Sequence, residues 1–325
     1  MIDYKSFIQD YFYIIDTSGN KIPFVFNDIQ DKYYQVLQND YGNNLKAIRE
    51  NILKARREGF SSFIEAIFMA DFILSTLGKL PIISGQVVSH KSEEVTPDMK
   101  RSNLFLDSYL EAEGLSRDQF LKTDNSSYIE SIIGAEYFVG TAGAKTLGRG
   151  GTLQNLHWTE VAFYPNTQTL NAENIVMPAE QQVSDGIGKI FRESTGNTLS
   201  DFFAIEYKAG KEGLGEFKSR FFSWFEFGEY KRDFPKGYQF TQEHDRFMKL
   251  HNLSKEQMYW YIKKVLEKTG IGSDGEDKLK KAKREYPTTD IEAFLVSGDM
   301  YFNGEAVEWY MDNTQLPIKT DLIYV

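Results

Sequence analysis

The hydrophobic pattern divides the chain into short apolar runs and longer helix-compatible stretches. Residues 80–89 form a short run with several β-branched residues, which is typical of a buried strand. The longer apolar run at 61–76 is compatible with a helix. Strands alternating with helices across residues 45–230 predict an α/β fold with a mainly parallel sheet.

The same pattern predicts most of the remaining elements. Asn27 or Asp28 can cap a helix that continues through Leu37, because both side chains accept hydrogen bonds from the free N–H groups of a helix start. The other predicted elements are a short helix or strand pair in 1–20, a strand that ends at 52–53, a helical region at 90–113 interrupted around Pro97, two strand pieces in 128–141, a strand from 153 that breaks at 159–160, helices at 169–184 and 198–210, and strands at 189–194 and 217–227.

From Tyr238 onward the composition changes. Helical stretches rich in Lys and Glu follow at 254–269 and 277–284. We therefore expect an α/β core in residues 1–235 and a small, mostly helical lid or linker subdomain in residues 236–325.

Composition narrows the class of protein. The chain has 325 residues, 41% of them hydrophobic and 15% aromatic, which is enough for a large core. It has no cysteine, so disulfides and thiolate metal sites are excluded. A net charge of −10 argues against a protein that simply coats nucleic acid, since such proteins are usually basic. The N-terminus lacks the basic region of a secretory signal, and the apolar runs are shorter than the ~20 residues of a membrane span, so we expect a soluble cytoplasmic protein.

Residues 52–63, ILKARREGFSSF, hold the main candidate for a binding site. A strand end, a turn and a helix start attract phosphate, because free backbone N–H groups and the helix dipole favour an anion there. Gly59 permits close approach of the backbone, and Ser61 or Ser62 can ligate a nucleotide-bound Mg²⁺. Lys54 can neutralise the β- and γ-phosphates, and Arg56 or Arg57 can add a bidentate contact.

This loop departs from the usual phosphate-binding sequence, which reads GxxxxGK followed by Ser or Thr. Phe60 stands where the lysine belongs. The alternative interpretation is a solvated basic turn in front of a core helix.

Glu160 is the second candidate. It ends an apolar strand far downstream of the loop, where a nucleotide hydrolase needs a carboxylate to polarise the attacking water. A carboxylate pair would strengthen the argument, but Thr159 precedes it. The alternative is a surface glutamate after a core strand.

Three further features carry side chains suited to phosphate or base chemistry. Arg149, on a glycine-rich loop, suits an arginine finger, a DNA contact or an exposed turn. Gln30 can read an adenine edge through its amide, or lie on the surface. The small polar residues at the end of the strand 189–194 can sense a γ-phosphate or cap a helix; these are Ser194, Thr195, Gly196 and Asn197. The histidines, His157 among them, show no metal-ligand spacing and are interpreted as structural.

The order of these features resembles the ATPase domain of the large terminase subunit of tailed bacteriophages, the motor that pumps viral double-stranded DNA into a procapsid. The resemblance covers roughly residues 20–300 and is carried by Gln30 and by segments at 54–62, 148–163, 193–197, 222–227 and 285–298. It implies a RecA-like P-loop NTPase core of the additional-strand, catalytic-glutamate type, and an enzyme that hydrolyses ATP with Mg²⁺.

The resemblance also implies roles for the nucleotide-binding residues. Gln30 matches a glutamine that contacts adenine, and Lys54 matches a lysine that some terminases place at the start of the phosphate loop. Arg56 matches the loop arginine, with Arg57 beside it, while Gly59 and Ser61 match the loop glycine and the metal-binding hydroxyl.

The catalytic and coupling residues are matched in the same way. Glu160 matches the catalytic glutamate, and Arg149 matches a loop arginine proposed to act in trans on a neighbour's nucleotide. Residues 194–197 match the motif that couples hydrolysis to domain movement. Thr159 stands where the family usually has an aspartate, which puts direct metal ligation from that strand in doubt.

Partners and location also follow from the resemblance. It implies double-stranded DNA, a portal protein, a small terminase subunit and a ring of copies when active, with a monomer in isolation, in the host cytoplasm at the procapsid portal. Large terminases continue into a C-terminal nuclease, and the chain ends where that domain is expected to begin. We therefore expect no DNA cleavage from residues 1–325.

Two alternatives stay open at this point. One is another RecA-like DNA translocase or helicase, which would need a second core with its own motifs. The other is a non-hydrolysing DNA-binding or structural module with a decayed phosphate loop, which Phe60 and Thr159 favour. Lys54, Glu160 and Arg149 in the expected order oppose it, and Lys54 is favoured over the arginines as the γ-phosphate contact.

Overall fold

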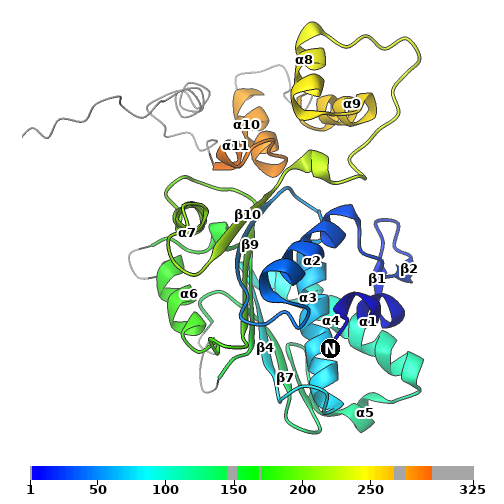
Figure 1. The fold of residues 1–325 in the computed structure, drawn as a ribbon, viewed down its shortest axis with the longest axis vertical. Coiled ribbons are helices and arrows are strands. Elements are labelled where there is room, and N and C mark those ends of the chain that lie inside the picture. The colour runs from blue at the N-terminus through cyan, green and yellow to red at the C-terminus, as the bar shows by residue number, and fades with distance from the viewer. Residues whose placement is uncertain (1, 145–151, 168–169, 267–274, 295–325) are drawn as a thin grey trace, which may run out of the picture.

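An eight-stranded sheet forms the centre of the molecule (Figure 1). The computed structural model describes residues 2–144, 152–167, 170–266 and 275–294. Along the sheet the strands follow the order β10 (Lys218–Phe222), β3 (Arg49–Lys54), β9 (Lys189–Ser194), β8 (Asn155–Thr159), β4 (Ser84–Ser89), β7 (Glu136–Thr141), β6 (Tyr128–Ser131) and β5 (Leu121–Asp124). The strands from β10 to β7 are parallel, and β6 and β5 are added antiparallel at one edge. The predicted α/β fold with a mainly parallel sheet is confirmed.

Helices cover both faces of the sheet (Figure 1). One face carries α1 (Tyr4–Tyr11), α2 (Asp28–Tyr41), α3 (Phe60–Thr76) and α4 (Ser92–Glu113), and the other carries α6 (Ala172–Glu180) and α7 (Phe202–Lys211). Each face has its own hydrophobic cluster. Helix α3 is buried along nearly its whole length, which explains an apolar run without a polar stripe.

The position of β9 decides the geometry of the sheet's carboxyl edge. This strand lies between β3, which leads into the phosphate-loop candidate, and β8, which leads into Glu160. The residues after β3 and β8 are therefore two strand spacings apart, roughly 10 Å. Because parallel strands share a carboxyl edge, the side chains that follow all three strands lie together there, and ligands of open α/β sheets generally bind in the crevice outside this edge.

Arg192 fastens β9 to the helices on one face. Its guanidinium is buried and donates two hydrogen bonds to the Glu180 carboxylate, at 2.8 and 2.5 Å, and one to Glu206 at 2.7 Å. Glu180 lies on α6 and Glu206 on α7. Side chains alternate along a strand, so Glu193 points to the opposite face, towards α3.

A third hydrophobic cluster lies in the helical segment after β10, although Ala293 and Phe294 of its last helix pack in the second cluster. Helices α8 (Gln242–His251), α9 (Lys255–Lys264), α10 (Gly275–Glu285) and α11 (Asp290–Phe294) lie beyond one end of the sheet (Figure 1). Trp224 forms its centre and stacks on Trp260 and Tyr261, with ring centroids 5.5 and 4.6 Å apart. This separate cluster supports a division of the chain near residue 235, which we keep as a proposal.

Most predicted elements are present, and the exceptions have local causes. Asn27 caps α2 through a capping box, and β9 has the predicted bounds. The predicted interruption at Pro97 is wrong, because α4 continues through it. The carbonyl that loses its partner there belongs to exposed Glu93, where water can bond it.

Helix α8 escaped prediction because it buries no residue, so its only sequence signal is the capping box that starts at Thr241.

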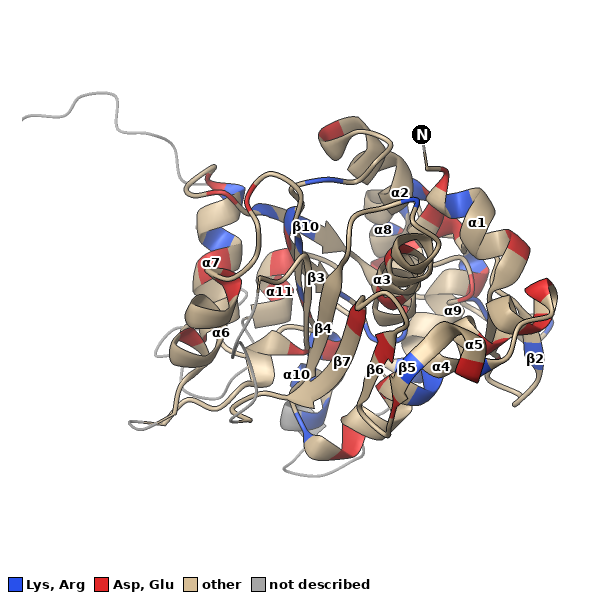
Figure 2. Ribbon diagram, turned by 90° about the horizontal axis from the view of Figure 1, so that it is seen from below, with Lys and Arg blue, Asp and Glu red and all other residues tan. Residues whose placement is uncertain are grey.

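Basic and acidic residues are not separated onto two sides in the part of the chain that the structure describes. Figure 2 shows Lys and Arg interleaved with Asp and Glu on the helices of both faces. Among the described helices, none combines the length and the apolar character needed to cross a bilayer.

Candidate functional site

The loop from β3 to α3 requires glycine at one position. Gly59 has φ +83°, a left-handed conformation, and a Cβ there would lie 2.6 Å from the Gln30 Nε2 atom. Helix α3 begins directly after Gly59, which has no side chain to cap it. The N–H groups of the first turn are therefore available to an anion, as the phosphate-loop hypothesis requires.

Two side chains of α2 and its cap hold this loop. The Gln30 amide is buried, donates to the Gly59 carbonyl at 2.8 Å and accepts from the Asn27 N–H at 3.0 Å. Asn27 Nδ2 donates to the Glu58 carbonyl at 3.1 Å. The structure thus gives Gln30 a loop-holding role, and its predicted contact with adenine stays a prediction.

Lys54 and Glu160 meet across the intervening strand. Lys54 is the buried last residue of β3, and its Nζ lies 3.2 Å from Glu160 Oε1. Burial alone lowers the pKa of Lys54, but the carboxylates of Glu160 and Glu193 outweigh burial and raise it. The amine therefore stays charged, as a phosphate-binding lysine must.

Glu160 is held in a specific orientation by the end of β9. Its Oε2 accepts hydrogen bonds from the N–H and Oγ1 of Thr195, both at 3.2 Å, and from Ser194 Oγ at 3.4 Å. The Glu160 backbone has φ +50°, which is uncommon for a residue with a side chain. Two residues of the 194–197 segment thus contact the carboxylate directly, and the side chain stays 26% exposed.

Glu193 is a site residue that the sequence interpretation missed. It is fully buried on β9, accepts a hydrogen bond from the Ser61 hydroxyl and lies 3.5 Å from His157 Nε2. Burial alone raises the pKa of Glu193, but Lys54, His157 and Ser61 lower it to about 2. Strand β9 also carries Lys189 and Arg192, so the local sequence did not single out Glu193 among its ionisable residues.

Glu58, inside the loop, was also missed. Its side chain is buried, and neither carboxylate oxygen has a hydrogen-bond partner within the described residues. Burial raises the pKa of Glu58 well above its usual range, and Glu226 adds to this while Lys54 opposes it. Nothing in the local sequence distinguishes this glutamate from a solvated loop residue.

The remaining predicted loop residues lie nearby in different environments. Arg56 is exposed, and its Nη1 lies 2.6 Å from Glu285 Oε1 of α10. Arg57 is exposed with a left-handed backbone, and Ser62 is partly buried in the first turn of α3. Phe60 is buried against the rings of Tyr33 and Phe222. Arg149 lies outside the described residues.

The end of β9 also contacts the helical segment. Asn197 Oδ1 accepts from Arg284 Nη1 of α10 at 3.3 Å. A Cβ placed on Gly196 would lie 2.1 Å from the Ala293 carbonyl oxygen of α11, so the two backbones touch. The segment 194–197 therefore joins Glu160 on one side to the helical segment on the other.

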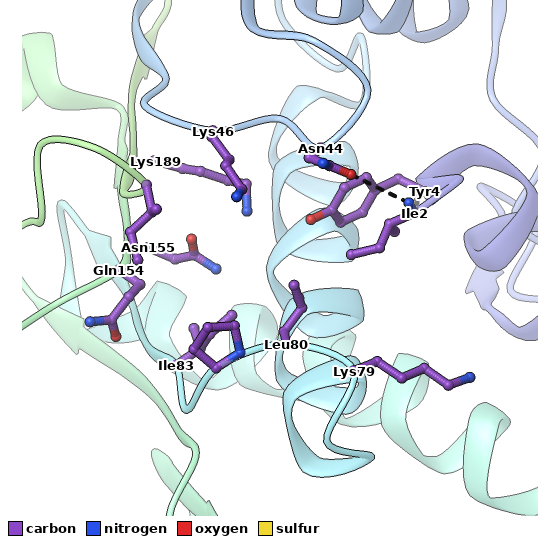
Figure 3. A pocket seen from close by; sticks show the side chains of 12 residues that line it. Ile2, Tyr4, Asn44, Lys46, Lys79, Leu80, Ile83, Gln154, Asn155 and Lys189 are labelled. Atoms are coloured by element: carbon purple, nitrogen blue, oxygen red, sulfur yellow. Dashed lines mark hydrogen bonds between the residues drawn. The ribbon is translucent and has the colours of Figure 1, made fainter.

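A separate cavity of about 270 Å³ lies at the amino ends of the parallel strands, opposite the carboxyl edge (Figure 3). Lys189 and Asn155, which line it, are the first residues of β9 and β8. Lys189 Nζ is 2.5 Å from the Asp71 carboxylate, so its charge is already paired. None of the predicted site residues lines this cavity.

The donor atoms near Ser61 suit a hard cation. No group of three or more His, Cys, Asp and Glu side chains that could hold a metal ion occurs within the described ranges. The Ser61 hydroxyl and the Glu193 carboxylate offer oxygen atoms, which Mg²⁺ prefers. Such an ion would need phosphate oxygens and water to complete its coordination, which fits metal that arrives with a nucleotide.

Comparisons by sequence give no match, either to protein-family models or to curated proteins. By structure, the chain is similar to the large terminase of bacteriophage HK97, with 13% identity and a TM-score of 0.51 over 82% of this chain and 51% of that chain. The large terminase of a thermophilic bacteriophage aligns at 13% identity, with a TM-score of 0.45 over 73% of this chain and 52% of that one. The large terminase ATPase domain of Thermus phage P74-26 aligns at 16% identity, with a TM-score of 0.45 over 79% of this chain and 96% of that one.

The chain spans about half the length of the first two of these proteins. At this level of identity the likeness to the HK97 protein concerns the fold. The chain therefore has the RecA-like P-loop α/β fold of a bacteriophage large terminase, as the resemblance of its motifs implied.

Proposed function

We propose that this chain is an ATP-hydrolysing motor domain that powers the translocation of viral double-stranded DNA into a procapsid. The observation that carries the proposal is the contact between Lys54 and Glu160, 3.2 Å apart across an intervening strand and beside an uncapped helix start. A lysine for phosphate and a carboxylate for water thus share one crevice. This convergence opposes a decayed phosphate loop, in which neither residue would need the other.

The proposed chemistry uses the groups as they lie. Lys54 and the N–H groups of the first turn of α3 bind the β- and γ-phosphates. The γ-phosphate competes with Glu160 for Lys54, and its arrival frees the carboxylate to orient a water for attack on phosphorus. The bond from the γ-phosphorus to ADP breaks as the new P–O bond forms, and the water's proton passes to Glu160 or to solvent. The Ser61 hydroxyl would hold an Mg²⁺ that arrives with the nucleotide, and this ion would neutralise charge on the phosphates.

Several roles rest on the motif resemblance. Gln30 would contact adenine, Arg56 or Arg57 would add a phosphate contact, and Arg149 would act on the nucleotide of an adjacent copy. The proposal includes a ring of copies on a portal protein, with double-stranded DNA and a small terminase subunit as partners, in the host cytoplasm.

Coupling between hydrolysis and movement would run through residues 194–197. Thr195 holds the Glu160 carboxylate, and Gly196 touches the backbone of Ala293 in α11. A change in the position of Glu160 would therefore reach the helical segment through two residues. We propose that this segment is the lid that moves in each cycle.

The protonation state of Glu58 would determine how readily the loop accepts phosphate. A buried carboxylate without hydrogen bonds from the described residues is costly when ionised, and it lies near the proposed phosphate site. Its ionised form repels phosphate, whereas its protonated form does not. The raised pKa therefore favours the form that is compatible with an anion in the loop.

Glu160→Gln should abolish ATP turnover while preserving nucleotide binding. The amide keeps the size of the side chain but cannot take a proton, and a general base typically contributes about 10²–10⁴-fold to rate. Hydrolysis is measured with DNA and portal protein present, and binding by titration with a fluorescent ATP analogue. Glu173→Gln, at an exposed position of α6, is the matched control. Undiminished hydrolysis in the Glu160 variant would remove Glu160 from this role.

Lys54→Ala should weaken nucleotide binding by roughly 10- to 100-fold, since hydrogen bonds to charged groups contribute about 1.5–3 kcal/mol. Equilibrium titration with an ATP analogue measures this, and a melting curve checks that the variant is folded. Lys46→Ala, an exposed lysine at the opposite edge of the sheet, should leave the affinity unchanged. If Arg56→Ala weakens binding and a folded Lys54→Ala does not, the arginine holds the phosphate instead.

Gly196→Ala should separate hydrolysis from DNA movement. The new methyl group must displace Ala293, whose carbonyl oxygen would lie 2.1 Å away, so the contact between β9 and α11 opens. We expect ATP hydrolysis with a loss of DNA packaged per ATP, measured in a packaging assay. Gly186→Ala is the control, because a Cβ there meets nothing within 4 Å. Equal packaging per ATP in both variants would contradict the coupling role.

Glu58→Gln should stabilise the protein, and more so at higher pH. The pKa of Glu58 in the folded protein lies above its usual value of 4.5, so the folded state holds the proton more tightly than the unfolded state does. The stability that this proton contributes is complete below pH 4.5 and is lost as pH rises through the folded pKa. The melting temperature of the variant should therefore exceed wild type by about 2 °C or more near pH 8, and by less near pH 4.5. Glu229→Gln, an exposed carboxylate, should show no such trend. A difference independent of pH would contradict the assignment.

A further inference from the structure

The strand before Glu160 lacks the acidic residue that would accompany a nucleotide-bound metal, and its neighbour supplies one. Thr159 ends β8 with a hydroxyl, and its register partner on β9 is Glu193. Partners in parallel strands point to the same face of the sheet, so Glu193 lies on the α3 side, as Thr159 does. Glu193 also pairs with Ile52 of β3, which puts it midway between the two strands that bracket the site.

The contacts of Glu193 leave one oxygen unsatisfied. Its Oε1 accepts from the Ser61 hydroxyl and lies 3.5 Å from His157 Nε2. Its Oε2 is buried and has no hydrogen-bond partner within the described residues. Buried polar atoms are nearly always hydrogen-bonded, and a carboxylate oxygen has a strong need for a donor. This atom therefore lacks a donor beside the hydroxyl proposed to bind metal.

We propose that Glu193 replaces the acidic residue missing at position 159 as the positioning residue of the metal site. Oε1 orients the Ser61 hydroxyl, so that its lone pair faces the cation, and Oε2 accepts a hydrogen bond from water in the cation's hydration shell. The inference rests on the proposed function, since the cation is the Mg²⁺ that accompanies ATP. Mg²⁺ keeps several waters when bound, and partners of its ligands and waters tune its affinity.

A purely structural role makes a different prediction. In that case Glu193 would only neutralise Lys54 and His157, and its loss would affect the fold and the site with or without metal. Lys54 already pairs with Glu160, however, and the contact with Ser61 would be incidental. The two roles therefore differ in the dependence of nucleotide binding on Mg²⁺.

The test measures nucleotide affinity in Mg²⁺ and in EDTA, using a fluorescent ADP analogue and this chain. For Glu193→Gln we expect the apparent Mg²⁺ affinity of the nucleotide complex to fall about 10- to 100-fold, the usual cost of losing a partner of a metal ligand, with no fall in the EDTA affinity. Glu50→Gln is the matched control: Glu50 is also buried, on β3, but it accepts from Tyr33, Tyr41 and Arg220. That variant should keep the full Mg²⁺ dependence.

A relocation variant sharpens the test. Adding Thr159→Asp to Glu193→Gln returns the carboxylate to the neighbouring strand at the paired position, and we expect it to restore part of the Mg²⁺ dependence. If Glu193→Gln does not fold, Glu193→Asp, which withdraws the carboxylate by one methylene, is assessed by the same criterion. The inference would be overturned if the folded variant keeps the full Mg²⁺ dependence of nucleotide affinity, or if its affinity falls equally in Mg²⁺ and in EDTA. In either case, nucleotide binding by the wild-type protein would still uphold the proposed function. Wild-type protein that binds no nucleotide would overturn both.

Discussion

The parallel register of β3, β9 and β8 is the constraint on which the site depends. It aligns Ile52 with Glu193 and Glu193 with Thr159, so the residues after each strand reach the same edge. A shift by one residue would turn Glu193 towards α6 and α7 and bring Arg192 to the crevice, because side chains alternate along a strand. Arg192 and its two glutamate partners make such a shift costly. The ion pairs of Arg192 on one face of the sheet thus keep Glu193 on the other face, beside Ser61.

Local sequence predicted the elements whose cause is local. The cap at Asn27, the apolar helix α3 and the strand β9 follow from residues within a few positions of each other. Lys54 and Glu160 were chosen one at a time, and only the fold puts them 3.2 Å apart. Glu58 and Glu193 could not be found in this way, because their importance comes from burial beside residues distant in the chain.

Among the described residues of the crevice, carboxylate side chains outnumber basic side chains. Lys54 faces the carboxylates of Glu160, Glu193 and Glu58, which together shape its pKa. Such a site binds a phosphate chain well only if cations accompany it or if one carboxylate takes up a proton. Under the proposed function, nucleotide binding would therefore depend on metal and on protonation more closely than in a loop with a lysine at position 60, where the cation would lie next to Ser61.

The helical segment touches the crevice at two points. Glu285 contacts Arg56 in the phosphate loop, and Ala293 contacts Gly196 beside Glu160. Thermodynamic linkage is reciprocal. If nucleotide binding shifts the position of these helices, a displacement of the helices changes the affinity for nucleotide. Under the proposed function, tension on the DNA that tilts this segment would change how tightly ATP is held. Resistance to DNA entry would then be sensed at the catalytic site without a separate sensor.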